Sequence, residues 1–158
     1  MDPALRSARV IVASTRAATG QYPDKTGPVI AEWLGKQGFR VEEPTVVPDG
    51  DAVGAAIRSA LGVSLVITTG GTGLSPTDAT PEQTAELLDY QIPGLADAIR
   101  RSGLPAVPTS ILSRGVCGVA GGTLVVNLPG STGGVRDGLA VLGGVLDHAL
   151  DQIGGGDH

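Results

Sequence analysis

Apolar residues along this chain follow two spacings, and stretches of the two kinds alternate. Runs rich in Val, Ile and Leu predict strands buried between other layers. These runs cover residues 10–13, 39–47, 63–69 and 123–128. Elsewhere apolar residues recur every three or four positions, which predicts helices over 28–37 and 51–61. Because strands alternate with helices, the pattern predicts an α/β domain with a largely parallel sheet.

Local signals add detail to this pattern. Pro44 makes the second strand an edge or irregular one, because proline removes a ladder donor. Thr80 is the expected N-cap of a helix over 81–88, with Pro81 in its first turn and Gln83 where a capping-box partner belongs. The other expected segments are a loop at 14–25, strands at 110–113 and 116–119, helices at 92–102 and 131–153, and a flexible, glycine-rich tail at 154–158.

Length and composition narrow the class of protein. A chain of 158 residues favours a single domain over 1–158, with a core at about 8–153. With 41% hydrophobic residues the chain as a whole is not disordered, and its 25 glycines follow no collagen period. The net charge of −5 argues against binding nucleic acid through a basic surface.

The composition also indicates in which cellular compartment the protein works. One cysteine, Cys117, fits a reducing environment. Apolar runs stay shorter than the ~18 residues that a membrane-spanning helix needs. We therefore expect a cytoplasmic protein with neither a membrane nor a nucleic acid as partner.

A long glycine-rich loop follows the strand at 63–69 and combines flexible backbone with hydroxyl donors. Its candidate binding residues are Thr69, Gly70, Gly71, Thr72, Gly73 and Ser75. Successive backbone N–H groups in such a loop form an anion-binding nest, and the start of the next helix adds partial positive charge. The alternative is a plain tight turn, but a connection as long as 68–80 is usually functional in a compact domain.

A second loop of this kind follows the strand at 123–128. Pro129 and Gly130 turn the chain, and Ser131 is placed to cap the helix that comes next. Helix N-termini bind anions, although an ordinary glycine turn is the alternative. Two such loops in one small domain predict two anionic groups, or one ligand that carries several.

Two aspartates are expected at the same sheet edge. Asp49 follows the strand at 39–47, and Asp78 lies in the first glycine-rich loop. Carboxylates beside a phosphate repel it unless a cation intervenes, and Mg²⁺ binds through one or two carboxylates plus substrate phosphates. The alternatives are a helix-capping role for Asp49, which is the role we favour for Asp51, and simple solvation for Asp78.

Three further residue types were weighed for chemistry. Arg114 either pairs with a carboxylate or phosphate, or solvates a turn. Cys117 has no histidine near it in sequence and is expected to be a small core residue. Because His and Cys do not cluster, a zinc site is not expected.

Five short motifs occur together in a fixed order. They are Thr68-Thr-Gly-Gly-Thr-Gly, Thr77-Asp-Ala-Thr-Pro-Glu-Gln-Thr84, Ile92-Pro-Gly94, Leu112-Ser-Arg114 and Asn127-Leu-Pro-Gly130. Together they resemble the Mog/MoaB family of molybdenum cofactor biosynthesis, whose domain also occurs in gephyrin. The resemblance covers roughly residues 8–150.

The resemblance implies a three-layer α/β/α sandwich with a mostly parallel sheet, assembled as a homotrimer. It implies molybdopterin adenylyltransferase activity, in which AMP passes from ATP to the molybdopterin phosphate with Mg²⁺ present and pyrophosphate is released. It also implies that the product is handed over to a molybdenum-insertion enzyme. Carried over by motif, Asp49 and Asp78 are the catalytic and metal-binding residues. The implied substrate-binding residues are Thr69, Gly70, Gly71, Thr72, Gly73, Ser75, Pro129, Gly130 and Ser131.

Two departures from the family pattern stand out. Many relatives have Ser-Asp in the first loop, where this chain has Ser14-Thr15. Many relatives have Pro-Lys after the Leu-Pro-Gly-Ser motif, where this chain has Thr132-Gly133. A lysine that would neutralise phosphate is therefore missing from the second loop. The alternative functions are a non-catalytic molybdopterin-binding or scaffold paralogue and a nucleotide hydrolase with the same loop geometry.

Overall fold

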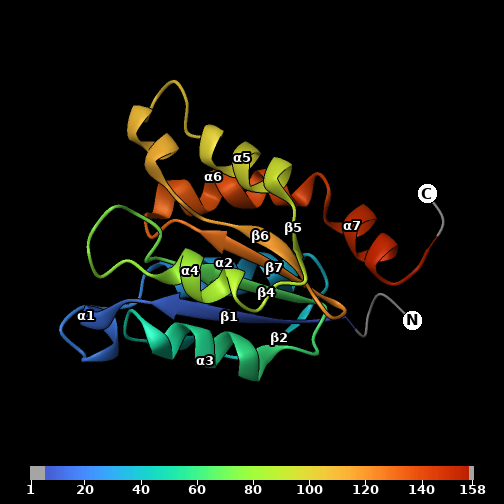
Figure 1. Ribbon diagram of the computed structural model, residues 1–158, viewed down its shortest axis with the longest axis horizontal. Helices are drawn as coiled ribbons and strands as arrows, with labels where there is room; N and C mark the ends of the chain where they lie inside the picture. Colours follow the sequence, from blue (N-terminus) through green and yellow to red (C-terminus); the bar gives the residue numbers. More distant parts are fainter. Residues whose placement is uncertain (1–5, 157–158) are drawn as a thin grey trace.

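A seven-stranded mixed sheet lies at the centre of the structure, a computed structural model that describes residues 6–156 (Figure 1). The strands are β1 Ser7–Ala13, β2 Arg40–Val41, β3 Thr45–Val47, β4 Leu65–Thr69, β5 Tyr90–Gln91, β6 Cys117–Ala120 and β7 Thr123–Leu128. Their order is β2-β1-β4-β7-β6-β5, and β3 also pairs with β1. Strands β1 to β4 and β7 are mutually parallel, whereas β6 runs in the opposite direction and pairs antiparallel with both β7 and β5. The predicted α/β class with a mostly parallel sheet is confirmed.

Helices cover both faces of this sheet. They are α1 Thr15–Ala18, α2 Thr26–Lys36, α3 Asp51–Ala60, α4 Thr80–Ala85, α5 Pro93–Arg101, α6 Thr132–Gly143 and α7 Leu146–Ile153, with a 3₁₀-helix η2 at Pro108–Leu112. The larger core joins the sheet to α2, α5, α6 and α7, and the smaller core joins the opposite face to α3. Figure 1 shows α5 and α6 on one side of the strands and α3 on the other.

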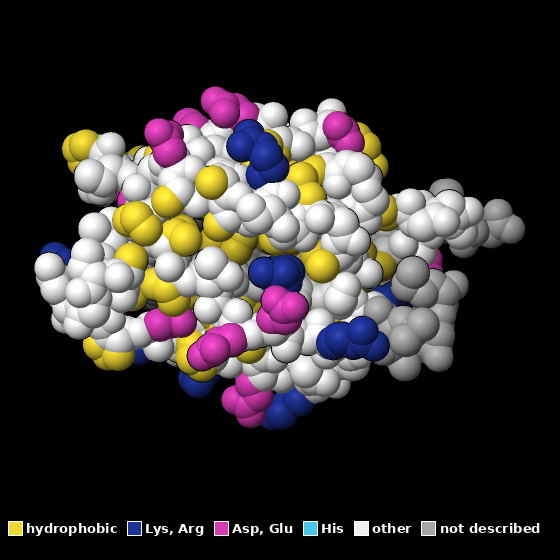
Figure 2. Space-filling view, turned by 90° about the horizontal axis from the view of Figure 1, so that it is seen from below, with side chains coloured by type: hydrophobic (Ala, Val, Ile, Leu, Met, Phe, Trp, Pro, Cys, Tyr) yellow, Lys and Arg dark blue, Asp and Glu magenta, His cyan; other side chains and the backbone are white. Residues whose placement is uncertain are grey.

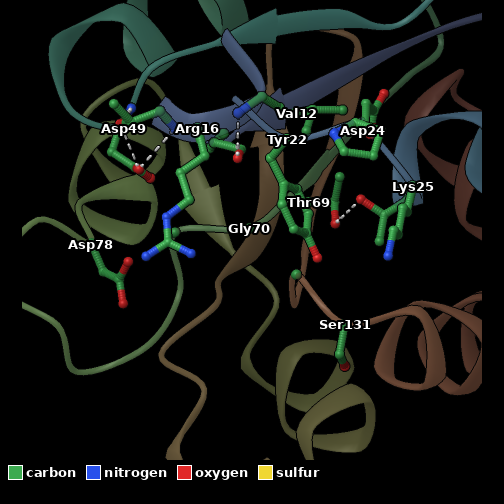
Figure 3. A pocket seen from close by; sticks show the side chains of 18 of the residues that line it. Val12, Arg16, Tyr22, Asp24, Lys25, Asp49, Thr69, Gly70, Asp78 and Ser131 are labelled. Carbon is green, nitrogen blue, oxygen red and sulfur yellow. Dashed lines mark hydrogen bonds between the residues drawn. The ribbon is translucent and has the colours of Figure 1, made fainter. Parts of the chain in front are cut away.

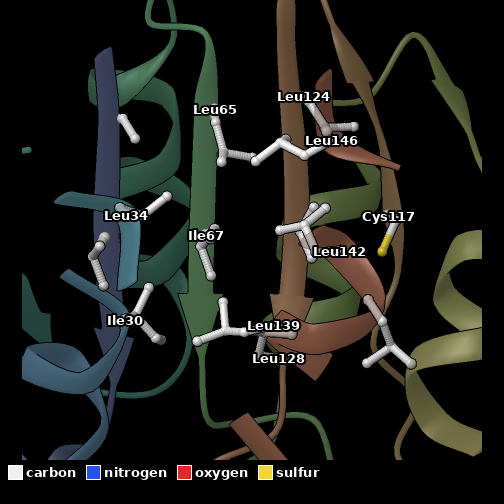
Figure 4. Packing of buried hydrophobic residues seen from close by; sticks show 14 of the residues in the cluster. Ile30, Leu34, Leu65, Ile67, Cys117, Leu124, Leu128, Leu139, Leu142 and Leu146 are labelled. Atoms are coloured by element: carbon white, nitrogen blue, oxygen red, sulfur yellow. The ribbon is translucent and has the colours of Figure 1, made fainter. Parts of the chain in front are cut away.

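The sequence of the central strand β4 shows no alternation of apolar and polar residues. Every residue of β4 is buried, because both of its faces are covered. Leu65 and Ile67 face the larger core beside Leu142 of α6 (Figure 4). Val66 belongs to the smaller core with Ile57 of α3.

Parallel strands carry their C-terminal ends to one edge of the sheet. Ser14 N–H donates to Val47 O at 2.9 Å, so the chain leaving β1 lies beside the end of β3. Gly70 N–H donates to Leu128 O at 3.1 Å, which joins the ends of β4 and β7. The segments after these four strands therefore meet, as ligand-binding segments do in open α/β sheets.

The prediction of one long helix at 131–153 is wrong, because this segment forms two helices. Helix α6 ends at Gly143, and α7 begins at Leu146. Gly143 and Gly144 are poor helix formers, and Val145 adopts φ −130° and ψ −6°. Leu142 of α6 and Leu146 of α7 are both buried in the larger core.

Two strand predictions also need correction. The strand at 39–47 is split into β2 and β3, because Pro44 has no N–H for the ladder; both pieces lie beside β1. The strand at 110–113 is wrong, since these residues belong to the 3₁₀-helix that Pro108 opens. The strand at 116–119 is present as β6, whereas the two-residue β5 was not predicted at all.

Two predicted helix caps are wrong. Helix α4 has Ala79 as its N-cap, with no capping side chain, and Gln83 Nε2 instead donates to Asp51 Oδ1 at 3.3 Å. The N-cap of α3 is Gly50, whose φ of +101° suits glycine, and Asp51 is only the first helical residue.

The two predicted irregular segments contain local order. The loop predicted at 14–25 includes the short helix α1, which Ser14 caps through a bond from Ala17 N–H. In the tail, Gly154 N–H donates to Leu150 O at 3.0 Å and Gly156 N–H to Asp151 O at 2.8 Å. The rest of the tail, residues 157–158, lies outside the described residues.

Candidate functional site

A cavity of about 740 Å³ opens at the edge where β1, β3, β4 and β7 end (Figure 3). It gathers seven of the predicted site residues, which come from three separate loops. They are Asp49, Thr69, Gly70, Gly71, Asp78, Gly130 and Ser131. Because these residues are far apart in sequence, the parallel sheet alone brings them together.

A second cavity of about 640 Å³ adjoins the first. It takes in the predicted residues Thr72, Gly73 and Pro129, together with the apolar side chains of Ile99 and Leu112. The two cavities share one wall, formed by Gly71, Asp78, Gly130 and Ser131.

Ser75 is the one predicted site residue that lines neither cavity. It is exposed on the outer part of the loop, and its N–H donates to Asp78 Oδ2 at 3.2 Å. Its hydroxyl lies 3.4 Å from that of Thr77. Ser75 therefore shapes the loop that carries Asp78, and direct substrate binding by Ser75 stays a prediction without geometric support.

The Asp49 carboxylate is held by the residue that departs from the family pattern. Thr15 Oγ1 donates to Asp49 Oδ2 at 3.0 Å, and Thr15 N–H donates to the same oxygen at 3.4 Å. The Asp49 N–H donates back to Thr15 Oγ1 at 3.1 Å. These bonds tie α1 to the end of β3 and leave Asp49 half-buried at the cavity wall.

Backbone packing requires glycine at the start of the first loop. Gly70 adopts φ +90°, and a methyl group on it would lie 2.4 Å from Ala13 O. Gly71 adopts φ +69°, again in the region that glycine favours. The close approach of β1 and the loop after β4 therefore depends on these two residues.

Arg114 holds the outer part of the same loop. Its Nε donates to Gly73 O at 2.9 Å, its Nη2 to Asp78 O at 3.0 Å, and its backbone N–H to Thr72 O at 2.7 Å. Its Nη1 donates to Glu82 Oε2, and this hydrogen bond lowers the pKa of the Glu82 carboxyl. Because a carboxylate already neutralises Arg114, this residue orders the loop and is not an open phosphate ligand.

The second loop is connected to the first. Ser131 caps α6 as predicted, by accepting a bond from Gly134 N–H at 3.1 Å. The hydroxyl of Thr69 donates to Pro129 O at 2.7 Å and is therefore engaged with the second loop. The start of α6, at Ser131 and Thr132, thus lines the first cavity together with the Asp49 and Asp78 carboxylates.

Two cationic side chains in the first cavity were missed in the sequence. Figure 3 shows Arg16 projecting into the cavity on the side of Asp49 and Asp78, with Lys25 on the other side. The Lys25 ammonium lies 5.3 Å from the centre of the Tyr22 ring. The sequence offered one signal for these residues, which was their place in the chain. Residues 14–25 follow a buried parallel strand, as both recognised loops do.

The chemistry of the donor set fits a divalent cation only when a ligand supplies further oxygens. Within residues 6–156, no three His, Cys, Asp or Glu side chains group as a metal site. Asp49 and Asp78 both line the first cavity, and Mg²⁺ is held by one or two carboxylates plus substrate phosphates. The two aspartates therefore fit Mg²⁺ bound together with a phosphorylated ligand.

Cys117 takes no part in this chemistry. It is buried in the larger core, as expected, and burial raises the pKa of its thiol to about 12. A thiol of that pKa carries almost no nucleophilic thiolate near neutral pH.

Comparison with known proteins places this geometry in a family. Residues 9–148 match the model of a family described as a probable molybdopterin binding domain. The solved structure of the molybdopterin biosynthesis Mog protein from Mycobacterium ulcerans is similar with a TM-score of 0.91 and 67% identity, over 94% of this chain and 99% of that one.

Curated relatives agree with that match. The molybdenum cofactor biosynthesis bifunctional protein of Synechococcus elongatus is 40% identical over 96% of this chain, and this chain spans about half, 48%, of its length. The molybdopterin adenylyltransferase of Escherichia coli is 36% identical over 85% of this chain and 70% of its own.

Proposed function

This chain belongs to the family of probable molybdopterin binding domains, and from that premise we propose that it is a molybdopterin adenylyltransferase. The proposed reaction transfers AMP from ATP to the phosphate of molybdopterin and releases pyrophosphate. One observation carries the proposal. A single cavity gathers the carboxylates of Asp24, Asp49 and Asp78, two cationic side chains and a helix N-terminus, which suit a reaction between two phosphate-bearing substrates.

The transfer is a single in-line displacement. A phosphate oxygen of molybdopterin attacks the α-phosphorus of ATP, and a new phosphorus–oxygen bond forms. The bond from the α-phosphorus to the oxygen that bridges it to the β-phosphorus breaks. The electron pair of that bond leaves with pyrophosphate, so the protein supplies mainly position and charge neutralisation.

We assign the phosphates of ATP to the first cavity. Arg16 and Lys25 would neutralise them there, in place of the lysine that is missing after Ser131. The second cavity would take the pterin ring, since Ile99 and Leu112 offer apolar contacts and Arg100 a polar one. The shared wall at Gly130 and Ser131 would then hold the molybdopterin phosphate at the start of α6.

Asp49 and Asp78 would hold Mg²⁺ in this reaction. When bound there, the ion would screen the negative charge of the two phosphorylated substrates. The chain's own contribution is to hold both carboxylates in place, Asp49 through Thr15 and the Asp78 backbone through Arg114.

The test of the function is Asp78→Asn, which keeps the shape of the side chain and removes its charge. AMP transfer to molybdopterin should fall by at least about 10²–10³-fold, the scale reported for loss of one preorganised electrostatic group. The control is Asp147→Asn, because Asp147 is exposed and pairs with Arg6 away from both cavities.

Thermal unfolding of both variants should match the unaltered protein. Turnover of Asp78→Asn at the unaltered rate would refute the proposal. Tight molybdopterin binding by the unaltered protein without AMP transfer would instead favour the non-catalytic paralogue, and ATP hydrolysis without pterin would favour the hydrolase.

The resemblance also leads us to propose a homotrimer of one-domain chains that acts in the cytoplasm and passes its product to a molybdenum-insertion enzyme. Among the described residues, no helix is both long and apolar enough to cross a bilayer.

A further inference from the structure

Thr80 carries a buried hydroxyl that has no hydrogen-bond partner within residues 6–156. The residue is 0% exposed, so water does not satisfy the group from outside. Buried polar groups in native proteins are nearly always hydrogen-bonded, because an unmade bond costs free energy. An unpaired hydroxyl therefore needs an explanation.

The Thr80 hydroxyl does not serve the helix that it begins. Threonine at a helix start ordinarily caps the first turn, yet α4 has no capping side chain, and Gln83 N–H donates to Ala79 O at 3.0 Å. The Thr80 backbone is fixed on both sides, since its N–H donates to Gly71 O at 3.1 Å and its carbonyl accepts from Thr84 Oγ1 at 2.7 Å. The hydroxyl is thus turned away from the helix by a firmly held backbone.

The space beside Gly71 is bordered both by this hydroxyl and by Asp49. A methyl group on Gly71 would lie 2.4 Å from Thr80 Oγ1 and 3.0 Å from Asp49 Oδ1. Both oxygens therefore lie within 3.0 Å of one point, which is open because residue 71 is glycine. Asp49 Oδ2 is bonded to Thr15, so Oδ1 is the oxygen left to face Thr80.

We propose that Thr80 is a positioning residue for Asp49, and that on cation binding a small side-chain movement closes the space beside Gly71, so that the Thr80 hydroxyl donates to Asp49 Oδ1. Thr15 and Thr80 would then hold the two carboxylate oxygens from opposite sides. A carboxylate fixed in this way keeps its remaining lone pairs aimed into the cavity. The inference rests on the proposed function in one respect, since it takes the task of Asp49 to be holding a divalent cation.

The test compares Thr80→Val, which keeps the shape and removes the hydroxyl, with Thr80→Ser, which restores it. Mn²⁺, an oxygen-binding cation with a paramagnetic signal, is titrated into each folded protein in the presence of a saturating, fixed concentration of a non-hydrolysable ATP analogue, because the two carboxylates need phosphate oxygens to complete the cation site. Loss of a partner that orients a metal ligand typically costs 10–100-fold in affinity, so Thr80→Val should bind Mn²⁺ at least about tenfold more weakly. Thr80→Ser should recover most of that affinity, and the Mg²⁺ concentration needed for half-maximal turnover should follow the same order.

Thr123→Val is the matched control, because Thr123 is a buried threonine at the start of β7 that lines neither cavity. Its hydroxyl donates to Val63 O at 2.7 Å and accepts from Gly62 N–H at 3.1 Å. Thr123→Val should lower the melting temperature and leave Mn²⁺ affinity unchanged. Thr80→Val should show the reverse, an affinity loss with little change in melting temperature.

Two outcomes would overturn the inference. The first is that the Thr80→Val variant binds Mn²⁺ as tightly as the unaltered protein. The second is a crystal structure in which Thr80 Oγ1 accepts a hydrogen bond from Gln83 N–H and so caps the helix. Asp49→Asn separates this failure from failure of the function. If Asp49→Asn abolishes cation binding and turnover while Thr80→Val changes neither, the proposed function stands and only the role of Thr80 falls.

Discussion

At the scale of single residues, the candidate site depends on side chains that bind backbone or other side chains rather than ligand. Thr15 holds Asp49, Arg114 holds the loop that carries Asp78, and Ser131 caps α6. Such supporting contacts matter because a displacement of about 1 Å at a reacting centre is enough to cost roughly 10²-fold in rate.

Arg114→Lys tests this support. Lysine keeps the positive charge but has one donor nitrogen, so it is unable to reach Gly73 O, Asp78 O and Glu82 together. We expect turnover to fall by about 10²-fold and amide exchange in residues 72–79 to rise. The exposed pair with Glu82 is worth only about 0–1 kcal/mol, so a larger fall in the melting temperature would report the loss of the bonds to Gly73 O and Asp78 O.

The control for this substitution is Arg101→Lys, since Arg101 forms an exposed pair with Asp97 and lines neither cavity. Unaltered turnover in Arg114→Lys would show that the loop keeps its shape without the three-way contact.

At the scale of elements, close packing between α6 and its neighbours explains why position 138 is glycine, although glycine is a poor helix former. Gly138 of α6 is buried, and a methyl group on it would lie 2.7 Å from Leu128 Cδ2 and 3.3 Å from Ile99 Cγ2. Glycine therefore lets α6 approach β7 and α5, which places the start of α6 at the cavity wall. By contrast, Gly35 of α2 has no atom within 4 Å of the same position.

The substitutions Gly138→Ala and Gly35→Ala should have opposite effects on stability. Alanine at 138 should destabilise the fold by about 1–3 kcal/mol through overpacking, in spite of its better helix propensity. Alanine at 35 should stabilise by about 0.4–1 kcal/mol, because it reduces the entropy of the unfolded chain. Urea unfolding measures both, and a stabilised Gly138→Ala would contradict the packing argument.

At the scale of the whole molecule, charge gives no single docking surface on the face that carries α3. Figure 2 shows Lys and Arg side chains interspersed there with Asp and Glu, and hydrophobic groups between them. The net charge of −5 makes nonspecific attraction of a nucleoside triphosphate unfavourable. Affinity for an anion must then come from local groups such as Arg16, Lys25 and the start of α6.

The proposed trimer is tested by the mass of the protein in solution. Light scattering on eluting protein should give three times the 15.8 kDa of one chain. A concentration series should keep this mass down to the micromolar range if the assembly is stable. A monomer mass throughout would contradict the proposal and leave the site on a single chain unaffected.

Local pattern was sufficient for most elements, because burial leaves either a continuous apolar run in a strand covered on both faces or a helical period in a helix covered on one. The runs at 63–69 and 123–128 correspond to β4 and β7, and the helices at 51–61 and 92–102 to α3 and α5. Both glycine-rich loops and the two aspartates were also recognisable, since Gly, Ser, Thr and Asp after a buried strand are typical of ligand loops. Prediction failed where the chain bends at Gly144, where Pro44 interrupts a strand, and in the two-residue β5.

The sequence did not predict which distant residues become neighbours, because the order of the strands in the sheet decides that. The pairing of β1 with both β3 and β4 puts Asp49 beside Gly71 and brings Arg16 and Lys25 into the same cavity. Thr80 shows the difference most clearly. Its sequence context indicates a helix cap, but in the fold the hydroxyl is buried without a partner among residues 6–156 and, like Asp49 Oδ1, borders the open position beside Gly71.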